Sequence, residues 1–327
     1  MNSTDRIIRA MQGAVDIVND SPHPVNKVSA CLFFEDDAIC STNLWPASID
    51  EKLGRETRIG NSSGTVHAET ACIFKSDQAT DGASMAITDP FCPNCAKNIV
   101  EAGIKYAYID HKGFEKEFWG RRAGHFKNMS MEIMARGGVS VYEVNRKNKD
   151  ITTIYEPAAD YVPAEDSPVE IEPETKTETA FEMVITHKSA LHYNRKIAVA
   201  LAETASGDVF SLCVRGHAVI GYSMKKDSDI DHMMQETGKY SFMQEPLNRL
   251  LIYAKRKGFK ILDEYIFCSQ VPTAREQVNF IGAGYKKLSI GDVFRSRDQS
   301  GIKARTLLEK HGLIEFNSID LNLSQYR

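Results

Sequence analysis

Apolar and polar positions along the first 145 residues predict an ordered series of helices and strands. Apolar side chains recur at helical spacing in residues 1–20, and two short apolar runs flank the polar turn at 35–37, as in an antiparallel hairpin. The elements that follow are a helix at 65–76, a strand at 85–88, a helix that ends at Gly103, a strand at 105–110, a helix at 124–138 and a strand at 139–144. This order predicts one α/β domain whose sheet is covered by helices on both faces.

The second half of the chain repeats this pattern after a break in composition. Residues 156–180 are rich in Pro, Glu, Asp and Thr and poor in large apolar side chains, which predicts an acidic linker. The stretches that match the first half are, in order, 190–205 for the opening helix, 208–223 for the hairpin, 240–258 for the helix at 65–76, and 264–290 and 292–319 for the remaining elements. We therefore expect a tandem duplication with domains at 1–155 and 181–327.

Composition narrows the class of protein. Apolar residues at 42% and charged residues at 26% are typical of soluble globular chains, and a net charge of −4 disfavours a nucleic-acid partner and favours a small-molecule substrate. No run approaches the roughly 18 consecutive apolar residues of a membrane span, and residues 1–20 lack the apolar run of a signal peptide. Seven cysteines, mostly in apolar runs, are typical of a reduced compartment. We expect a cytoplasmic protein without a membrane partner.

One group of residues in the first half has the residue types and spacing of a catalytic metal site. His67 and Glu69 stand in the predicted helix at 65–76, and Cys92 and Cys95 follow about two dozen residues later. One histidine and two thiolates are three ligands of the type that Zn²⁺ prefers, which leaves a fourth tetrahedral position for water, as in catalytic zinc sites. Both sets are expected at helix N-termini, where the helix dipole keeps thiols deprotonated. Glu69 is close enough to reach the water without binding the metal.

The motif "HAE" followed by "CPNCAKNIVEAGIKYAYID" resembles the zinc-dependent cytidine and deoxycytidylate deaminase superfamily, most closely its deoxycytidylate branch. The resemblance implies a three-layer α/β/α fold, zinc held by the His and the two Cys, and Glu69 as the catalytic proton carrier. It also implies that the Ala68 backbone N–H meets the pyrimidine oxygen and that Asn43 touches the sugar. The family's proline directly precedes its first cysteine, whereas here Phe91 stands between them.

Several alternatives stay open at this point. The amino-bearing substrate could be deoxycytidylate, cytidine or another base such as guanine, and two further classes are a nucleic-acid editing deaminase and a protein with a purely structural zinc. Basic residues that could meet a 5′-phosphate are Lys52, Arg55, Arg58, Arg121 and Arg122. Clustered basic side chains are more often a solvated face, which is the interpretation we favour for each of them.

The second half has no counterpart of the zinc ligands. The positions that align with the motif are Met243 or Gln244 for His67, Glu245 for Glu69, and residues near Val271 and Ala274 for the two cysteines. Residues 181–327 are therefore expected to form a degenerate, non-catalytic copy that packs against the first domain as an internal pseudo-dimer partner. The chain could also form a homo-oligomer.

Overall fold

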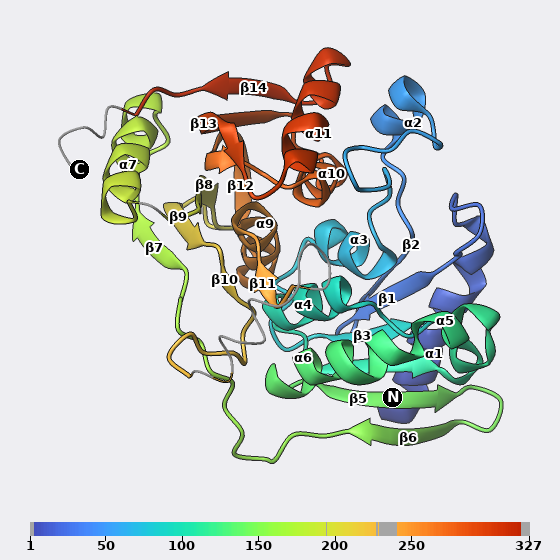
Figure 1. Ribbon diagram of the computed structural model, residues 1–327. Helices are drawn as coiled ribbons and strands as arrows, with labels where there is room; N and C mark the ends of the chain where they lie inside the picture. The colour runs from blue at the N-terminus through green and yellow to red at the C-terminus, as the bar shows by residue number, and fades with distance from the viewer. Residues whose placement is uncertain (1–2, 194, 227, 229–240, 322–327) are drawn as a thin grey trace. The chain divides into compact units, whose positions relative to one another are not determined.

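The computed structural model describes residues 3–193, 195–226, 228 and 241–321, with the side chains of Phe118, Trp119, Arg121 and Arg122 outside the described part (Figure 1). The chain divides into two compact units. Unit 1 is Met1–Leu44, Val66–Asp166 and Ala218–Met243, and unit 2 is Trp45–Thr65, Ser167–His217 and Gln244–Arg327. Among the described residues, no helix has both the length and the apolar character needed to cross a bilayer.

Unit 1 is built on a six-stranded sheet with the order β2-β1-β3-β4-β5-β6, in which β3, β4 and β5 are parallel and the other pairs are antiparallel. Its strands are β1 Ser29–Phe33, β2 Ala38–Thr42, β3 Ser84–Ile87, β4 Tyr106–Asp110, β5 Ser140–Asn145 and β6 Asp150–Tyr155. Its helices are α1 Ser3–Ile17, α3 Ala68–Lys75, α4 Pro93–Glu101, α5 Glu117–His125 and α6 Met131–Arg136, with shorter helical turns at η1 Val18–Asp20, η2 His111–Glu115 and η3 Phe126–Ser130.

Helices cover both faces of this sheet. Met11 and Ala14 of α1 pack on Cys31 and Phe33, which point to one face of β1. On the other face α3 lies over β1, and the Cys72 thiol donates to the carbonyl of Ala30. All five residues of β1 are buried because both faces of the strand are covered. The predicted strands and helices of the first half are confirmed, and three elements were not predicted: a helix at Ala47–Leu53, most of α5, and β6.

Two of the seven cysteines are joined in this structure. Cys31 and Cys40 face each other across the β1/β2 pair, with their Cα atoms 4.0 Å apart, and form a disulfide. The expectation that the cysteines are reduced thiols is therefore wrong for this pair. The two residues come from the two strands of the predicted hairpin, and the register of that hairpin brings them together. The other five cysteines are free.

Unit 2 has a six-stranded sheet with the order β7-β9-β8-β12-β13-β14, in which β12, β13 and β14 are parallel. The five strands from β9 to β14 repeat the order β2-β1-β3-β4-β5 of unit 1, whereas the sixth strand lies at a different edge, β7 beside β9 and β6 beside β5. Its strands are β7 Glu170–Pro173, β8 Ile197–Glu203, β9 Val209–Arg215, β12 Lys260–Val271, β13 Lys287–Ser296 and β14 Glu315–Ser318. Its helices are α2 Ala47–Leu53, α7 Glu178–Leu191, α9 Pro246–Lys257, α10 Ala274–Gly282 and α11 Gln299–Lys310. A further two-stranded sheet pairs β10 His217–Ala218 with β11 Met243–Gln244.

The shared strand order confirms the duplicated three-layer α/β/α fold, with β8 and β9 in the places of β1 and β2. Two predicted matches are wrong. The hairpin is formed by β8 and β9, so the stretch predicted as the hairpin, 208–223, contains only its second strand. Residues 190–205 do not form the opening helix, because Ile197–Glu203 is the central strand β8 and the opening helix is α7. The first six residues of β8 are all buried, and a continuous apolar run of this kind gives no periodicity that separates a strand from a helix. The strand β7 lies inside the stretch predicted as a linker.

Each unit contains one segment from the other half of the sequence. Residues 218–243 belong to unit 1, where the Arg136 guanidinium lies 4.4 Å from the centre of the Tyr222 ring and the Gly221 backbone N–H donates to Ala164. Gly221 has φ +100°, and a Cβ there would lie 2.3 Å from the Arg136 carbonyl oxygen. Lys97 of α4 donates to the carbonyls of Ser241 at 2.8 Å and Met243 at 2.9 Å. The domain boundaries predicted from composition stay a prediction, since the compact units are discontinuous in sequence.

Candidate metal centre

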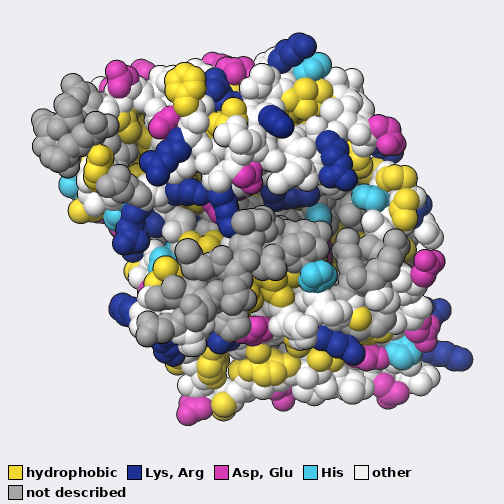
Figure 2. All heavy atoms as spheres, in the orientation of Figure 1, with side chains coloured by type: hydrophobic (Ala, Val, Ile, Leu, Met, Phe, Trp, Pro, Cys, Tyr) yellow, Lys and Arg dark blue, Asp and Glu magenta, His cyan; other side chains and the backbone are white. Residues whose placement is uncertain are grey.

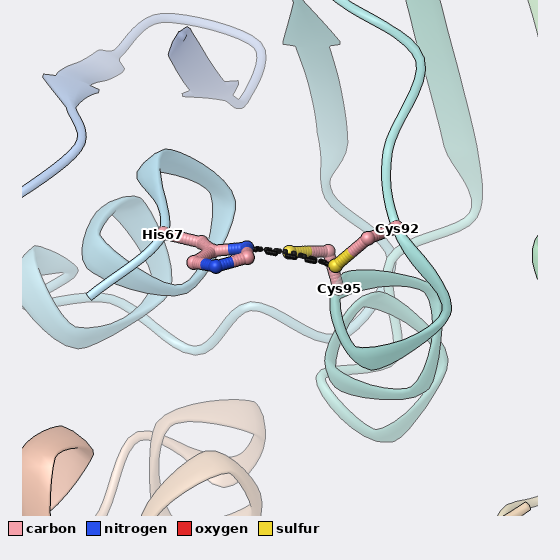
Figure 3. A group of neighbouring side chains, drawn as sticks. All are labelled: His67, Cys92 and Cys95. Atoms are coloured by element: carbon pink, nitrogen blue, oxygen red, sulfur yellow. Dashed lines mark hydrogen bonds between the residues drawn. The ribbon is translucent and has the colours of Figure 1, made fainter. Parts of the chain in front are cut away.

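Three of the predicted site residues lie together in unit 1. His67 Nδ1 is 3.1 Å from Cys95 Sγ and 3.5 Å from Cys92 Sγ, and the two sulfur atoms are 3.5 Å apart (Figure 3). Zinc bonds of about 2.0–2.3 Å place tetrahedral N and S ligands roughly 3.3–3.8 Å apart. Two of the three separations lie in this range, and the third, 3.1 Å between His67 Nδ1 and Cys95 Sγ, reaches it with a small side-chain movement. The group therefore suits a zinc ion, and a nitrogen with two sulfurs is a donor set that zinc prefers.

The local sequence explains why the ligands meet. His67 is the N-cap of α3 and Cys92 is the N-cap of α4, each with an extended backbone just before its helix begins. Pro93 occupies the first turn of α4, where its fixed φ favours the start of a helix. The N–H groups of a first helical turn have no partner within the helix and carry partial positive charge. Two such ends converge on the group, which favours thiolate ligands.

The pKa values of the two cysteines shift in opposite directions. The hydrogen bond from Cys95 holds the pKa of Cys92 well below its usual value, whereas burial raises the pKa of Cys95 well above it. Of the two, Cys92 loses its proton more readily. A cation at this position would supply the charge that Cys95 needs to lose its proton as well.

Glu69 lies in the first turn of α3 with 3% of its surface exposed. Its carboxyl group is in hydrogen-bonding contact with Cys95, and burial raises its pKa above the usual value. A buried carboxyl with a raised pKa holds a proton closer to neutral pH, which suits a group that must both accept and return one. The arrangement can carry acid–base chemistry beside a metal.

The two predicted substrate contacts also lie beside His67. Ala68 is the first residue of α3 and is fully buried. An antiparallel bridge between Leu44 and Val66 places Asn43 level with His67. The Asn43 Oδ1 atom accepts from the Val28 backbone N–H at 3.0 Å, which fixes the orientation of the side chain. The structure places both residues near the metal ligands, and their roles remain predictions.

One residue that links the two helices of the candidate ligands was not predicted from the sequence. The Asn98 side-chain amide donates to Thr70 Oγ1 at 2.9 Å and thereby links α4 to α3, with both side chains buried. An Asn on the apolar side of a predicted helix was the available signal. Phe91, which departs from the family pattern, is 2% exposed and packs edge-on against Phe126, with ring centres 5.2 Å apart. The extra residue before Cys92 is therefore part of the core.

The basic residues considered for phosphate binding are not part of the group around His67 in the described structure. Arg55 forms an ion pair with Asp50, in which Arg55 Nη2 lies 2.7 Å from Asp50 Oδ2. Lys52 donates to the Gly312 carbonyl. Both lie in unit 2, as does the exposed Arg58. The Arg121 and Arg122 side chains are outside the described part. On the face drawn in Figure 2, acidic side chains lie among the basic ones.

The predicted alignment of the second half is wrong by about two residues. Glu245 is the N-cap of α9 and Thr273 is the N-cap of α10, so these residues hold the places of His67 and Cys92. Glu276, at the third position of α10, holds the place of Cys95. The slip arose because neither helix start in this half carries the diagnostic His or Cys. The counterpart of the ligand group is therefore Glu, Thr and Glu.

Comparisons with known proteins support the resemblance to deaminases. No protein-family model matches the chain. A protein of Aliivibrio fischeri, named "Uncharacterized deaminase in luxG 3'region", is 26% identical over 99 residues, which span 30% of this chain and 65% of that protein. The apo dCMP deaminase of cyanophage S-TIM5 is 22% identical and covers 44% of this chain and 100% of its own, with a TM-score of 0.30. Acinetobacter baumannii RibD, form 1, is 12% identical and covers 99% of this chain and 73% of its own, also at 0.30. TM-scores of 0.30 are too low to establish a shared fold.

Proposed function

We propose that this protein is a zinc-dependent hydrolytic deaminase whose substrate is a free cytosine nucleotide or nucleoside. The observation that carries the proposal is Glu69, a buried carboxyl with a raised pKa, in contact with a ligand of a group that fits zinc. A structural zinc site has no use for such a carboxyl group. The A. fischeri relative, a deaminase by name, supports the same class of reaction.

His67, Cys92 and Cys95 would hold the zinc. When bound, the metal supplies a Lewis acid that activates water near neutral pH. Glu69 would take a proton from the water and give it to the ring nitrogen as hydroxide adds to the amino-bearing carbon. It would then take a second proton from the added hydroxyl group and give it to the amino group, which leaves as ammonia as the C–N bond breaks. Burial of the site excludes bulk water, so the proton stays on the path between Glu69 and the base.

The remaining contacts orient the base. The Ala68 backbone N–H is proposed to donate to the pyrimidine oxygen, since it lies at the start of α3, where N–H groups are not used within the helix. Asn43 offers its amide Nδ2 to a sugar hydroxyl, because its Oδ1 is already engaged by Val28. Unit 2 is proposed to be a non-catalytic partner, and the protein to act in the cytoplasm.

The test is an ammonia-release screen of the zinc-loaded full chain. The panel contains cytosine, cytidine, deoxycytidine, CMP, dCMP, guanine, adenine and a single-stranded oligonucleotide, with Glu69→Gln as the matched variant. We expect deamination of the free cytosine compounds, and at least about 100-fold loss in the variant with zinc retained. Equal or faster deamination of the oligonucleotide, release only from guanine, or a variant within about tenfold of the parent would overturn the proposal.

A further inference from the structure

Unit 2 contains a second group of metal-binding side chains, remote in sequence from the first. One ligand atom from each of Glu170, His192 and Cys213 lies within 4.8 Å of the other two. The group is formed by the edge strand β7, the C-terminal end of α7 and the strand β9 (Figure 1). It shares no residue with His67, Cys92 and Cys95 and does not depend on the proposed deaminase activity.

The register of the sheet brings two of the three ligands together. Glu170 and Cys213 are directly paired residues of the antiparallel strands β7 and β9, so their side chains leave the same face of the sheet. Cys213 packs in the core beneath α7 and is 2% exposed. His192 caps the C-terminus of α7, which places its ring over this pair. Three separate elements thus converge on one point.

The side chain of His192 points into the group and is paired there with Glu170. It is 9% exposed, and its Nε2 lies 2.8 Å from Glu170 Oε1, yet that contact lacks the geometry of a hydrogen bond. A buried ring nitrogen that faces a carboxylate oxygen and a thiol without a well-formed hydrogen bond is the pattern of a ligand set. Tetrahedral zinc would need the N and O atoms roughly 3.3 Å apart, a small side-chain movement.

Lys188 orients the carboxylate and does not occupy the ligand position. Its Nζ donates to Glu170 Oε2 at 3.0 Å and to Glu172 Oε1 at 2.7 Å, with the lysine side chain 3% exposed. The interaction uses the oxygen that points away from His192 and leaves Oε1 directed at the ring. A hydrogen-bonded second oxygen is what fixes a carboxylate ligand in established metal sites.

We propose that Glu170, His192 and Cys213 form a second zinc site, structural in role, that ties β7 to α7 and β9. The mixed O, N and S donor set suits Zn²⁺, with a solvent molecule as fourth ligand on the side where Glu170 is partly exposed. The site secures an edge strand of only four residues, which sheet pairing alone holds weakly.

The test counts metal in the full-length protein after it is stripped with a chelator, reloaded with Zn²⁺ and dialysed. We expect about two zinc ions per wild-type chain, about one for Cys213→Ser, and about one for His192→Gln. Both variants should keep the circular dichroism spectrum and the cooperative urea unfolding of the parent, which shows that they fold. Cys268→Ser is the matched control, since Cys268 is a buried cysteine of the same unit outside the group, and it should keep two.

Cobalt gives a second readout. Co²⁺ loading should produce thiolate-to-metal absorption that decreases in Cys213→Ser, because that variant loses one of the three sulfur ligands of the chain. Cys213→Ser and His192→Gln proteins that both hold as much zinc as the wild type, whatever that amount is, would show that the group is only an ion-pair network around Lys188.

Discussion

Lys97→Met should destabilise unit 1 far more than replacement of an exposed lysine such as Lys105. Lys97 lies in α4, two residues after Cys95, and is 3% exposed. Its ammonium donates to the carbonyls of Ser241 and Met243, 144 and 146 residues away in sequence, and Ser241 is fully buried. Methionine keeps the length of the side chain and removes all three N–H donors.

The size of the effect follows from the two carbonyls that lose this donor. A hydrogen bond to a charged group contributes about 1.5–3 kcal/mol, and a buried acceptor left without a donor costs about 1–3 kcal/mol. Relief from burying an ammonium group offsets part of that loss. We expect a net loss of about 3 kcal/mol in the free energy of unfolding of unit 1.

The assay is urea denaturation of the full chain followed by circular dichroism, with the free energy of unfolding extrapolated to water. Lys105→Met is the matched control, because Lys105 is an exposed lysine just before β4 and its replacement should change stability by less than about 0.5 kcal/mol. If Lys97→Met proved as stable as Lys105→Met, the two carbonyl contacts would not hold residues 241–243 on α4, and the reasoning would fail.

Three other substitutions have distinct expected outcomes. Cys95→Ala should remove one zinc per chain, measured by elemental analysis. An unchanged zinc content would show that Cys95 is not a zinc ligand. Asn98→Ala should cost about 1–2 kcal/mol in urea denaturation by breaking the bond to Thr70, and wild-type stability would contradict this. Burial raises the pKa of Glu276 from 4.5 to about 7, so its stabilisation is complete below about pH 4.5 and is lost as pH rises through 7. Glu276→Gln should therefore reduce the fall in the free energy of unfolding between pH 4.5 and 7. A fall as large as that of the wild type would contradict the raised pKa of Glu276.

The ligand group could be predicted from the sequence because its residues combine a diagnostic chemistry with a short spacing. His67 and Cys92 stand at helix starts that local signals locate, and the helix N-termini then bring them together. Contacts between distant parts of the chain leave no such trace. Nothing in the sequence around Lys97 indicates that its partner is the backbone of Ser241, and nothing around Cys31 indicates that the register of the hairpin pairs it with Cys40.

The edge strand β7 was missed for a different reason. Its residues Glu-Ile-Glu-Pro resemble a linker in composition, and it is a strand because β9 offers an open edge to pair with. A central strand such as β8 gives the opposite error, since burial on both faces removes the alternation that identifies a strand. Edge and central strands thus depend on tertiary context that a local pattern does not contain.

The second copy keeps the architecture of the metal centre by another means. Glu276 Oε1 accepts from the backbone N–H groups of Leu247 at 2.9 Å and Asn248 at 3.3 Å, and Oε2 accepts from the Thr273 N–H at 2.7 Å and its hydroxyl at 2.8 Å. One carboxyl group therefore joins the N-termini of α9 and α10, which is the task that a metal would perform for α3 and α4.

Little space remains beside this carboxyl group. The cavity beside Glu276 has a volume of about 10 Å³, which is room for one water molecule. Glu245, in the place of His67, is paired with Arg297 and lies 3.6 Å from Lys196, so its charge is already balanced without a metal. Leu247 takes the place of Glu69 on the helix and cannot carry a proton. Unit 2 thus lacks the side chains that form the candidate metal centre of unit 1, which agrees with the proposal that it is a non-catalytic copy.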